Sequence, residues 1–370
     1  MSEVAQLLEP LIRARTDHPG GDERALAVAL AEALARRGAD QVEVVDVPRQ
    51  GQKGAYVLAR FGRPRRIVNA HLDTVPPNAG WSRDPFAPQI VDGQEGARLV
   101  GLGAADTKGA IAAILSALDE ERPRDLAVLF SGDEERSGTC LRAFLDSGAA
   151  KGIEQAIVCE PTGCRVGTRH RGVLALEARL CGEGGHSSRA DELPAPIAEL
   201  ARLAVAWDDW GRAQRGRGPA GFLGMCLNVA ALDGGIAFNV VPSEARLSIS
   251  ARPPPGVEVG AVRDELLAIA KRRMPAATLH VVVENPPFLT RALETFRPLL
   301  GALIEQPIDL GFWTEAAMLS SAGIDAVVIG PGEIAQAHAP DEWVAIEELE
   351  RARAIFAALF ASTREAHGAG

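Results

Sequence analysis

Histidines and carboxylates follow several predicted strands of this 370-residue sequence, at positions where one sheet edge could bring them together. They are His71 and Asp73 after the strand 66–69, Glu134 and Glu135 after 126–130, Glu160 after 156–159, and His338 after 326–329. Another acid, Asp106, lies in a glycine-flanked turn before the apolar helix 109–118. Imidazole nitrogens and carboxylate oxygens are zinc ligands, and a neighbouring carboxylate can accept a proton from metal-activated water. The residue types therefore suggest metal-dependent hydrolysis.

Each pattern also has a plainer interpretation when it is taken alone. A His-x-Asp tripeptide is common by chance, so His71 and Asp73 could be a solvated loop pair. In a metal site, alternation would place both on one side of an extended chain, where the Asp73 carboxylate can bond the second nitrogen of a ligating His71. The acids 133–135 could instead match the positive end of a helix. As a functional pair, one of two neighbouring carboxylates would bind a cation while the next accepts a proton from metal-bound water.

The glycine-flanked segment 101–109 could be taken for a phosphate-binding turn before a helix. Asp106 would repel a phosphate there, and no third glycine has the dinucleotide-binding spacing. We therefore reject the phosphate-binding interpretation of this turn.

Helix and strand signals alternate along the chain, which predicts an α/β fold with a mostly parallel sheet. Between residues 172 and 284 the order becomes β-α-β-β-α-β, the ferredoxin-like arrangement. The helix-then-strand pattern returns after Pro286. The prediction is a catalytic domain of residues 1–171 and 285–370, with an inserted lid and dimerisation domain of residues 172–284.

Composition and charge narrow the possible partners. The net charge of −10 argues against nucleic acid and anionic membranes, which both need a concentrated positive field. No apolar run is long enough for a membrane span, and the N-terminus lacks a secretion signal. The five cysteines have no metal-binding or disulfide spacing, so we expect reduced, buried thiols in a cytoplasmic protein.

In their order along the chain and in their amino-acid sequence, these motifs resemble the zinc-dependent exopeptidase and deacylase family. That family includes acetylornithine deacetylases, desuccinylases, aminoacylases and carboxypeptidases. The resemblance implies two zinc ions per subunit, with cobalt as a possible substitute. It implies that Asp106 bridges both ions, with His71 and Glu160 on the first and Glu135 and His338 on the second. It also implies that Asp73 orients His71, and that Glu134 is the general base and acid.

The same resemblance assigns residues in the predicted lid. His186, in the segment 182–188, would reach the active site of a partner subunit in a homodimer and stabilise the oxyanion. Arg252 would bind the substrate α-carboxylate, and Asn239 would lie near the substrate. The remaining histidines lack such motifs, and we expect surface or loop residues at His18, His170, His280 and His367.

Local motifs suggest a branch within the family. The segments 101–106, 314–316 and 330–342 resemble acetylornithine deacetylases, whereas 312–315 also resembles N-acetylcitrulline deacetylases. The expected reaction removes acetate from N-acetyl-L-ornithine, a small N-acyl amino acid of arginine biosynthesis. N-acetyl-L-citrulline deacetylase is the first alternative, followed by succinyl-diaminopimelate desuccinylase and a dipeptidase or carboxypeptidase. A non-catalytic protein of the same fold would be expected to lack a ligand or Glu134, and every position is filled.

Overall fold

The chain divides into two compact units in the computed structural model, which describes residues 2–49, 52–93 and 96–365. The core unit comprises Met1–Thr168, Thr290–Leu310 and Thr314–Gly370. The inserted unit comprises Arg169–Leu289 and Gly311–Trp313. The sequence places these boundaries at 171/172 and 284/285, and a short return of the chain to the inserted unit at 311–313 is not predicted.

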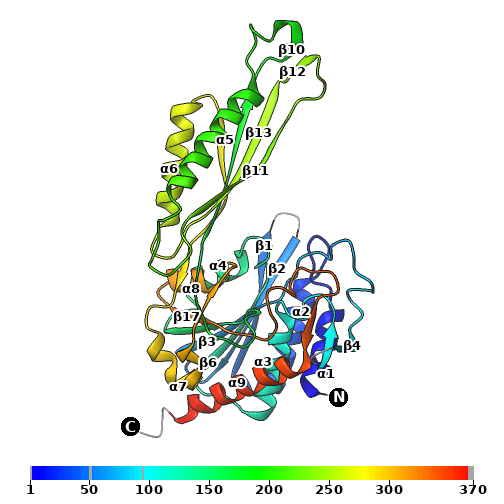
Figure 1. Ribbon diagram of the computed structural model, residues 1–370. Helices are drawn as coiled ribbons and strands as arrows, with labels where there is room; N and C mark the ends of the chain where they lie inside the picture. Colours follow the sequence, from blue (N-terminus) through cyan, green and yellow to red (C-terminus); the bar gives the residue numbers. More distant parts are fainter. Residues whose placement is uncertain (1, 50–51, 94–95, 366–370) are drawn as a thin grey trace. The chain divides into compact units, whose positions relative to one another are not determined.

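The core unit is built on a sheet whose centre is parallel (Figure 1). The strand order is β1-β2-β6-β3-β7-β17-β8, and the pairs β6-β3, β3-β7 and β7-β17 are parallel. The larger strands are β1 Gln41–Arg49, β2 Gln52–Phe61, β3 Arg66–His71, β6 Leu126–Ser131, β7 Gln155–Val158, β8 Gly167–His170 and β17 Asp325–Val328. The smaller strands are β4 Gln89–Gly93, β5 Gly96–Val100, β16 Ile308–Leu310 and β18 Trp343–Ala345. The mostly parallel α/β sheet expected from the sequence is confirmed.

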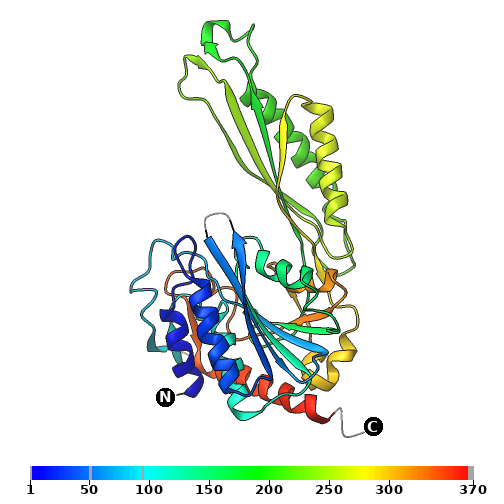
Figure 2. The same ribbon diagram turned by 180° about the vertical axis from the view of Figure 1, so that it is seen from behind.

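Helices cover both faces of this sheet, as the alternation of apolar residues in β2 illustrates. Val57 belongs to the core cluster that also contains residues of α2, which lies across β1 and β2 (Figure 2). Tyr56, on the opposite face, makes an edge-to-face contact with Phe144 of α4. The helices of this unit are α1 Glu3–Arg13, α2 Glu23–Arg36, α3 Lys108–Glu120, α4 Thr139–Asp146, α7 Arg297–Leu300, α8 Ala316–Ser321 and α9 Ile346–Glu365, with 3-10 turns η2 Leu293–Phe296 and η3 Gly301–Glu305.

The inserted unit has a four-stranded antiparallel sheet in the order β11-β13-β9-β14, with α5 and α6 packed against it (Figure 1). Its elements are β9 Val173–Cys181, β10 Gly185–His186, η1 Ser187–Arg189, α5 Pro196–Ala213, β11 Cys226–Gly234, β12 Val240–Val241, β13 Glu244–Arg252, α6 Val259–Arg273, β14 Thr278–Asn285 and β15 Phe288–Leu289. Trp207 fills the centre of its core and donates a hydrogen bond to the Leu266 carbonyl. The element order and the sheet order are those of the ferredoxin-like arrangement.

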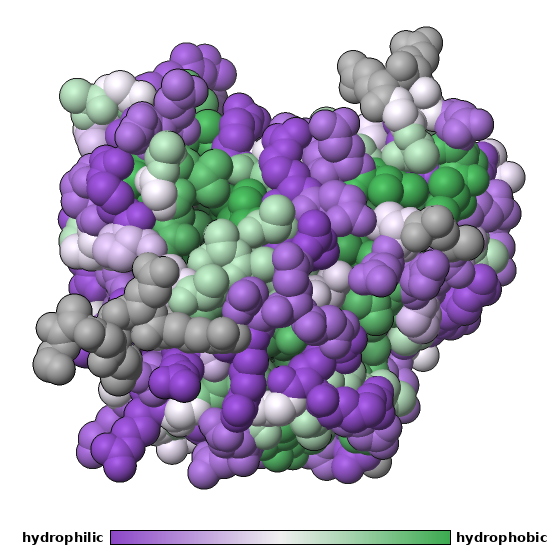
Figure 3. All heavy atoms as spheres, turned by 90° about the horizontal axis from the view of Figure 1, so that it is seen from below, coloured by the Kyte–Doolittle hydropathy of each residue, from purple (hydrophilic) through white to green (hydrophobic). Residues whose placement is uncertain are grey.

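The surface mixes polar and apolar residues. On the face drawn in Figure 3, hydrophilic side chains surround several separate hydrophobic areas. Within the described ranges, no helix combines the length and the apolar character that crossing a membrane requires. Cys140, Cys159 and Cys164 are buried, but the expectation of buried thiols is wrong for Cys181 and Cys226, which are exposed. Cys181 ends β9, where alternate residues face away from the core.

Candidate metal centre

The chemistry-bearing residues of the core unit gather at the carboxyl ends of four neighbouring parallel strands. His71 is the last residue of β3, Glu134 and Glu135 follow β6, and Glu160 follows β7. The loop after β17 carries His338. Because β6, β3, β7 and β17 are adjacent and parallel, their following loops meet at one sheet edge.

A first group of possible metal ligands consists of His71, Asp106 and Glu160. All three side chains are buried, and one donor atom from each lies within 4.8 Å of the others. Nε2 of His71 lies 2.8 Å from Oδ1 of Asp106. This is the group that the family resemblance assigns to the first zinc ion.

A second group consists of Asp106, Glu135 and His338. Nε2 of His338 lies 2.9 Å from Oε1 of Glu135 and 3.4 Å from Oδ2 of Asp106. The two oxygens of Asp106 therefore face different histidines, because Oδ1 faces His71 and Oδ2 faces His338. A carboxylate placed in this way can bridge two ions.

The electrostatics of the cluster fit a dication. Burial, together with the charge of Asp106, raises the pKa of Glu160 well above its ordinary value and raises that of Glu135. Burial and neighbouring Glu160 likewise raise the pKa of Glu134 well above its ordinary value. Burial also acts to raise the pKa of Asp106, but hydrogen bonds from His338 and His71 hold it below its ordinary value. A bound dication would compensate the carboxylates that crowd together here, and the nitrogen and oxygen donors suit zinc.

The Asp73 carboxylate has different partners from those expected. Nδ1 of His71 lies 2.9 Å from the main-chain oxygen of Asp73 and 3.7 Å from Oδ1 of its carboxylate. The predicted hydrogen bond between His71 and the Asp73 carboxylate is therefore replaced by one that the Asp73 carbonyl accepts from His71. The carboxylate instead accepts hydrogen bonds of 3.1 Å from the backbone N–H groups of Glu134 and Glu135. Alternation along the chain fixes the side of Asp73 but not which of its oxygens reaches the ring.

The turn that carries Asp106 is held by a residue whose role the sequence reasoning missed. Glu342 is buried, and its carboxylate accepts hydrogen bonds from the backbone N–H groups of Gly103, Ala105 and Asp106. A close approach elsewhere depends on Gly330, where a Cβ would overlap the backbone of Glu160. Both contacts join segments far apart in sequence. The one sequence signal for them was that Glu342 follows His338 closely.

The three residues predicted for the lid belong to the inserted unit and are exposed. His186 lies beside Asn239, because the Ser187 N–H donates to the Asn239 carbonyl and His186 pairs with Val240. Arg252 ends β13, which begins at Glu244 on the side of β12. At about 3.3 Å per residue, β13 separates Arg252 from the other end of that strand by roughly 25 Å.

The expectation for the other histidines is partly wrong. His170 is a buried strand residue, which contradicts the expectation, whereas His18 lies in a turn as expected although it is buried. His280 is exposed as expected, and His367 lies outside the described residues. His170 packs against Phe288 and Trp313 inside the inserted unit. His18 lies near Asp73 of the core unit.

Comparison with known proteins gives a consistent relationship. Residues 67–362 match the family described as peptidase family M20/M25/M40. The chain is 35% identical over 332 residues to an N-acetyl-L-citrulline deacetylase of Xanthomonas campestris, covering 84% of each chain. It is 32% identical over 337 residues to an acetylornithine deacetylase of Myxococcus xanthus, covering 86% of this chain and 83% of that one. Its fold matches an M20 family metallo-carboxypeptidase of Sulfolobus solfataricus with a TM-score of 0.77 at 18% identity, covering 98% and 99% of the two chains.

The family match covers most of the chain, and two groups of possible metal ligands share the Asp106 carboxylate. Together these two findings identify the family of the chain. The chain belongs to peptidase family M20/M25/M40 and is a metal-dependent amidohydrolase.

Proposed function

We propose that the protein removes the acetyl group from N-acetyl-L-ornithine, giving L-ornithine and acetate in the cytoplasm as a step of arginine biosynthesis. The observation that carries the hydrolytic part is Asp106, shared by two ligand groups with Glu134 beside them. The deacetylase names of two relatives support an N-acetyl amino acid as substrate. The motifs 101–106 and 314–316 support ornithine as the amino acid.

The proposed cofactor is a pair of zinc ions, for which cobalt can substitute. His71 and Glu160 would hold one ion, Glu135 and His338 the other, and Asp106 both. Bound there, such ions would supply Lewis acidity that polarises the amide carbonyl and lowers the pKa of water.

Glu134 is the proposed proton carrier. One of its carboxylate oxygens lies within 4.8 Å of donor atoms of His71 and Glu135, so it borders the ligands without belonging to either of the two groups that share Asp106. In the proposed reaction it takes a proton from the attacking water and passes it to the departing amine. The Asp73 carboxylate holds the backbone of this loop, so Glu134 keeps its place while the proton moves.

The inserted unit is proposed to bind substrate and to form a homodimer. The planar guanidinium of Arg252 suits an α-carboxylate, and His186 would donate to the developing oxyanion. Because Arg252 lies far along β13 from His186 and Asn239, one inserted unit cannot bring all three to one small substrate. A second subunit would resolve this, with His186 and Asn239 supplied by the partner. The exposed edge strand β11 and the fully exposed Phe238 offer a surface for such pairing.

N-acetyl-L-citrulline is the second candidate substrate, favoured by the 35% identical relative and by the segment 312–315. Citrulline ends in a neutral ureido group and ornithine in a cation, so the pocket around the side-chain end decides between them. The net charge of −10 contributes little, because physiological salt screens distant charges over about 8 Å.

The test is a comparison of kcat/KM for N-acetyl-L-ornithine, N-acetyl-L-citrulline and N-succinyl-diaminopimelate, with dipeptides as a further set. We expect the two acetylated amino acids to exceed the others and ornithine to lead. A preference for N-acetyl-L-citrulline would reverse the order of the two deacetylase candidates. A preference for the succinylated substrate or for dipeptides would contradict the proposed function.

A further inference from the structure

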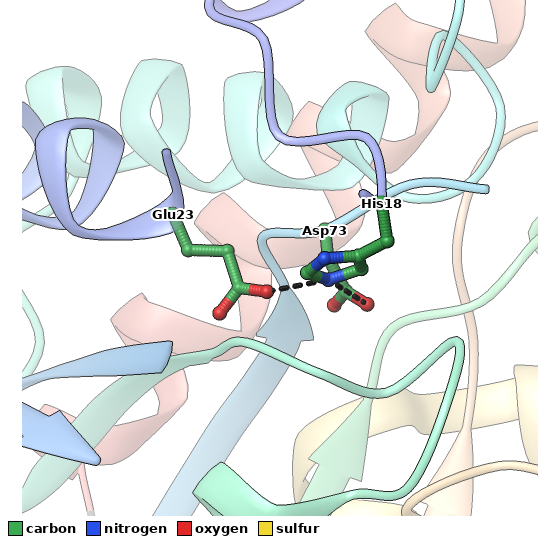
Figure 4. Close-up of side chains that lie close together, drawn as sticks. All are labelled: His18, Glu23 and Asp73. Carbon is green, nitrogen blue, oxygen red and sulfur yellow. Dashed lines mark ion pairs between the residues drawn. The ribbon is translucent and has the colours of Figure 1, made fainter. Parts of the chain in front are cut away.

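A buried ion-pair cluster lies beside the proposed catalytic loop and is not part of the ligand groups described above. It consists of His18, Glu23 and Asp73, whose side chains are each 5% exposed or less (Figure 4). Nε2 of His18 lies 2.6 Å from Oε1 of Glu23 and 3.6 Å from Oδ2 of Asp73. Figure 4 shows the imidazole ring between the two carboxylates. The arrangement joins the N-terminal segment to the residue that holds the Glu134–Glu135 backbone.

The backbone explains how His18 reaches this position. Residues 16–18 run beside 73–74, because Asp17 forms a parallel bridge with Thr74 and the Thr74 N–H donates to the Thr16 carbonyl. A tight turn follows, in which the Gly21 N–H donates to the Asp17 carbonyl. Gly21 suits this turn, since a Cβ there would overlap the backbone of Thr16.

Glu23 is fixed from the other side. It is the first residue of α2, and Asp22 caps that helix by accepting a hydrogen bond from the Ala25 N–H. The Glu23 carboxylate packs against Gly132, because a Cβ at this glycine would overlap the carboxylate. Gly132 immediately precedes the loop of Glu134 and Glu135, so Glu23 contacts the start of that loop. His18 contacts Asp73, whose carboxylate accepts the hydrogen bonds from that loop.

Charge makes the contact between His18 and Asp73 consequential. Asp73 is fully buried close to further acids, and the burial of a carboxylate is costly unless hydrogen bonds and an oppositely charged partner contact it. The two backbone N–H groups supply the hydrogen bonds, and His18 lies within ion-pair distance of Oδ2, as His71 does of Oδ1. Interaction with Asp73 and Glu23 raises the pKa of His18 to about 9, so its ring is cationic at neutral pH.

We propose that His18, held by Glu23, is a positioning residue that fixes the Asp73 carboxylate and through it the Glu134–Glu135 loop. The inference rests on the proposed hydrolytic role of Glu134 for its effect on rate. Its structural part, the order of the loop, is independent of metal and substrate.

The first measurement is amide hydrogen exchange in the metal-free full-length protein, followed in a peptide spanning 132–137. The variants are His18→Gln and Glu23→Gln, which keep polar side chains of similar size, and their double variant. We expect each single change to speed exchange in this peptide by about tenfold, because a local hydrogen-bonded opening becomes easier. The double variant should exceed the larger single effect only slightly, since the two residues act through one contact.

The matched control is His170→Gln, which alters another buried histidine but in the inserted unit. It should leave exchange in 132–137 unchanged. If His18→Gln speeds exchange throughout the core unit, the variant has lost general stability. Exchange of the peptide 132–137 in the isosteric Glu23→Gln protein then tests the proposal. Unchanged exchange in 132–137 in a folded Glu23→Gln or His18→Gln protein overturns the proposal.

The second measurement separates positioning from general stability. With metal saturating and rates expressed per bound metal pair, His18→Gln should lower kcat at least about tenfold while KM stays within about twofold, because a displaced loop misplaces the base without removing substrate contacts. Unchanged kcat would contradict the link to catalysis. Should the wild-type protein bind a third equivalent of zinc that His18→Gln loses, the cluster is a metal site and the positioning role is wrong. If wild-type protein hydrolyses none of the proposed substrates, the proposed function fails, whereas the exchange experiment still decides the inference.

Discussion

His71 and Asp106 approach within 2.8 Å through Nε2 and Oδ1, although one ends a central strand and the other lies in a turn before α3. Two donor atoms of one tetrahedral zinc ion, each roughly 2 Å from the metal, lie about 3.3 Å apart. A separation of about 0.5 Å more would therefore turn this hydrogen-bonded pair into two ligands of one ion.

Metal removal is the first prediction that follows. Treatment with a chelator should abolish hydrolysis, and zinc or cobalt should restore it, because the described core unit offers two ligand groups around Asp106. Metal analysis of the reloaded protein should give two ions per chain. Asp106→Asn should bind fewer ions than wild type, with His280→Gln, a change at an exposed histidine, as the control. Full activity in a sample shown to be free of metal would end the metallohydrolase assignment.

The adjacent acids Glu134 and Glu135 should respond differently to the same substitution. Glu134→Gln keeps the size and removes the base, so metal content should stay near normal while kcat falls by roughly 10² to 10⁴. Glu135→Gln should lose metal instead, because its Oε1 faces His338 within the second ligand group. Metal analysis and kcat for each purified variant provide the comparison. Two active, fully loaded variants would show that the roles are misassigned.

Subunit exchange tests whether sites are shared. His186→Ala and Glu134→Gln proteins should each be nearly inactive, yet mixing them should restore activity through hybrid dimers that pair an intact His186 with an intact Glu134. Mass measurement of differently tagged subunits confirms that hybrids form. If Arg252 serves its own chain, mixing Arg252→Ala with Glu134→Gln should restore no activity. Each site of such a hybrid lacks either Arg252 or Glu134. Hybrids that form and remain inactive would place His186 outside a shared site.

The stability of the metal-free protein should depend on pH through His18. Its pKa rises from 6.5 to about 9 on folding, so its stabilising contribution is complete below pH 6.5 and is lost as the pH rises through 9. The difference in free energy of unfolding between wild type and His18→Gln should therefore be large at pH 6 and small at pH 10. Urea unfolding across this range gives the measurement. A constant difference would mean that the charge of His18 does not contribute.

Four of the five proposed ligands could be predicted to meet at one sheet edge because each follows a buried strand. Once β3, β6, β7 and β17 are parallel neighbours, the ends of the strands alone bring His71 and Glu160 to one edge. At Asp106, electrostatics excluded a phosphate but did not name a partner for the acid. Its proposed role as a shared ligand came from the family resemblance.

The supporting residues could not be predicted in the same way. His18 reaches Asp73 only because 16–18 pairs with 73–74, and such long-range pairing leaves no periodic trace in the sequence. Glu23 looked like an ordinary acid in the first turn of a helix, although its side chain is directed into a buried cluster. Asp73 shows the limit most directly, because its carboxylate and its carbonyl lie close together and only the folded chain decides which one meets His71.

The position of the inserted unit between β8 and the last part of the core unit has a consequence for synthesis. His71, Asp106, Glu135 and Glu160 all precede this unit, and His338 follows it. A nascent chain therefore presents four of the five proposed ligands before the ribosome has made the fifth. The strand β17, which completes the parallel centre of the sheet, also follows the inserted unit in the sequence. The second proposed ligand group can therefore be completed only after the inserted unit has been synthesised.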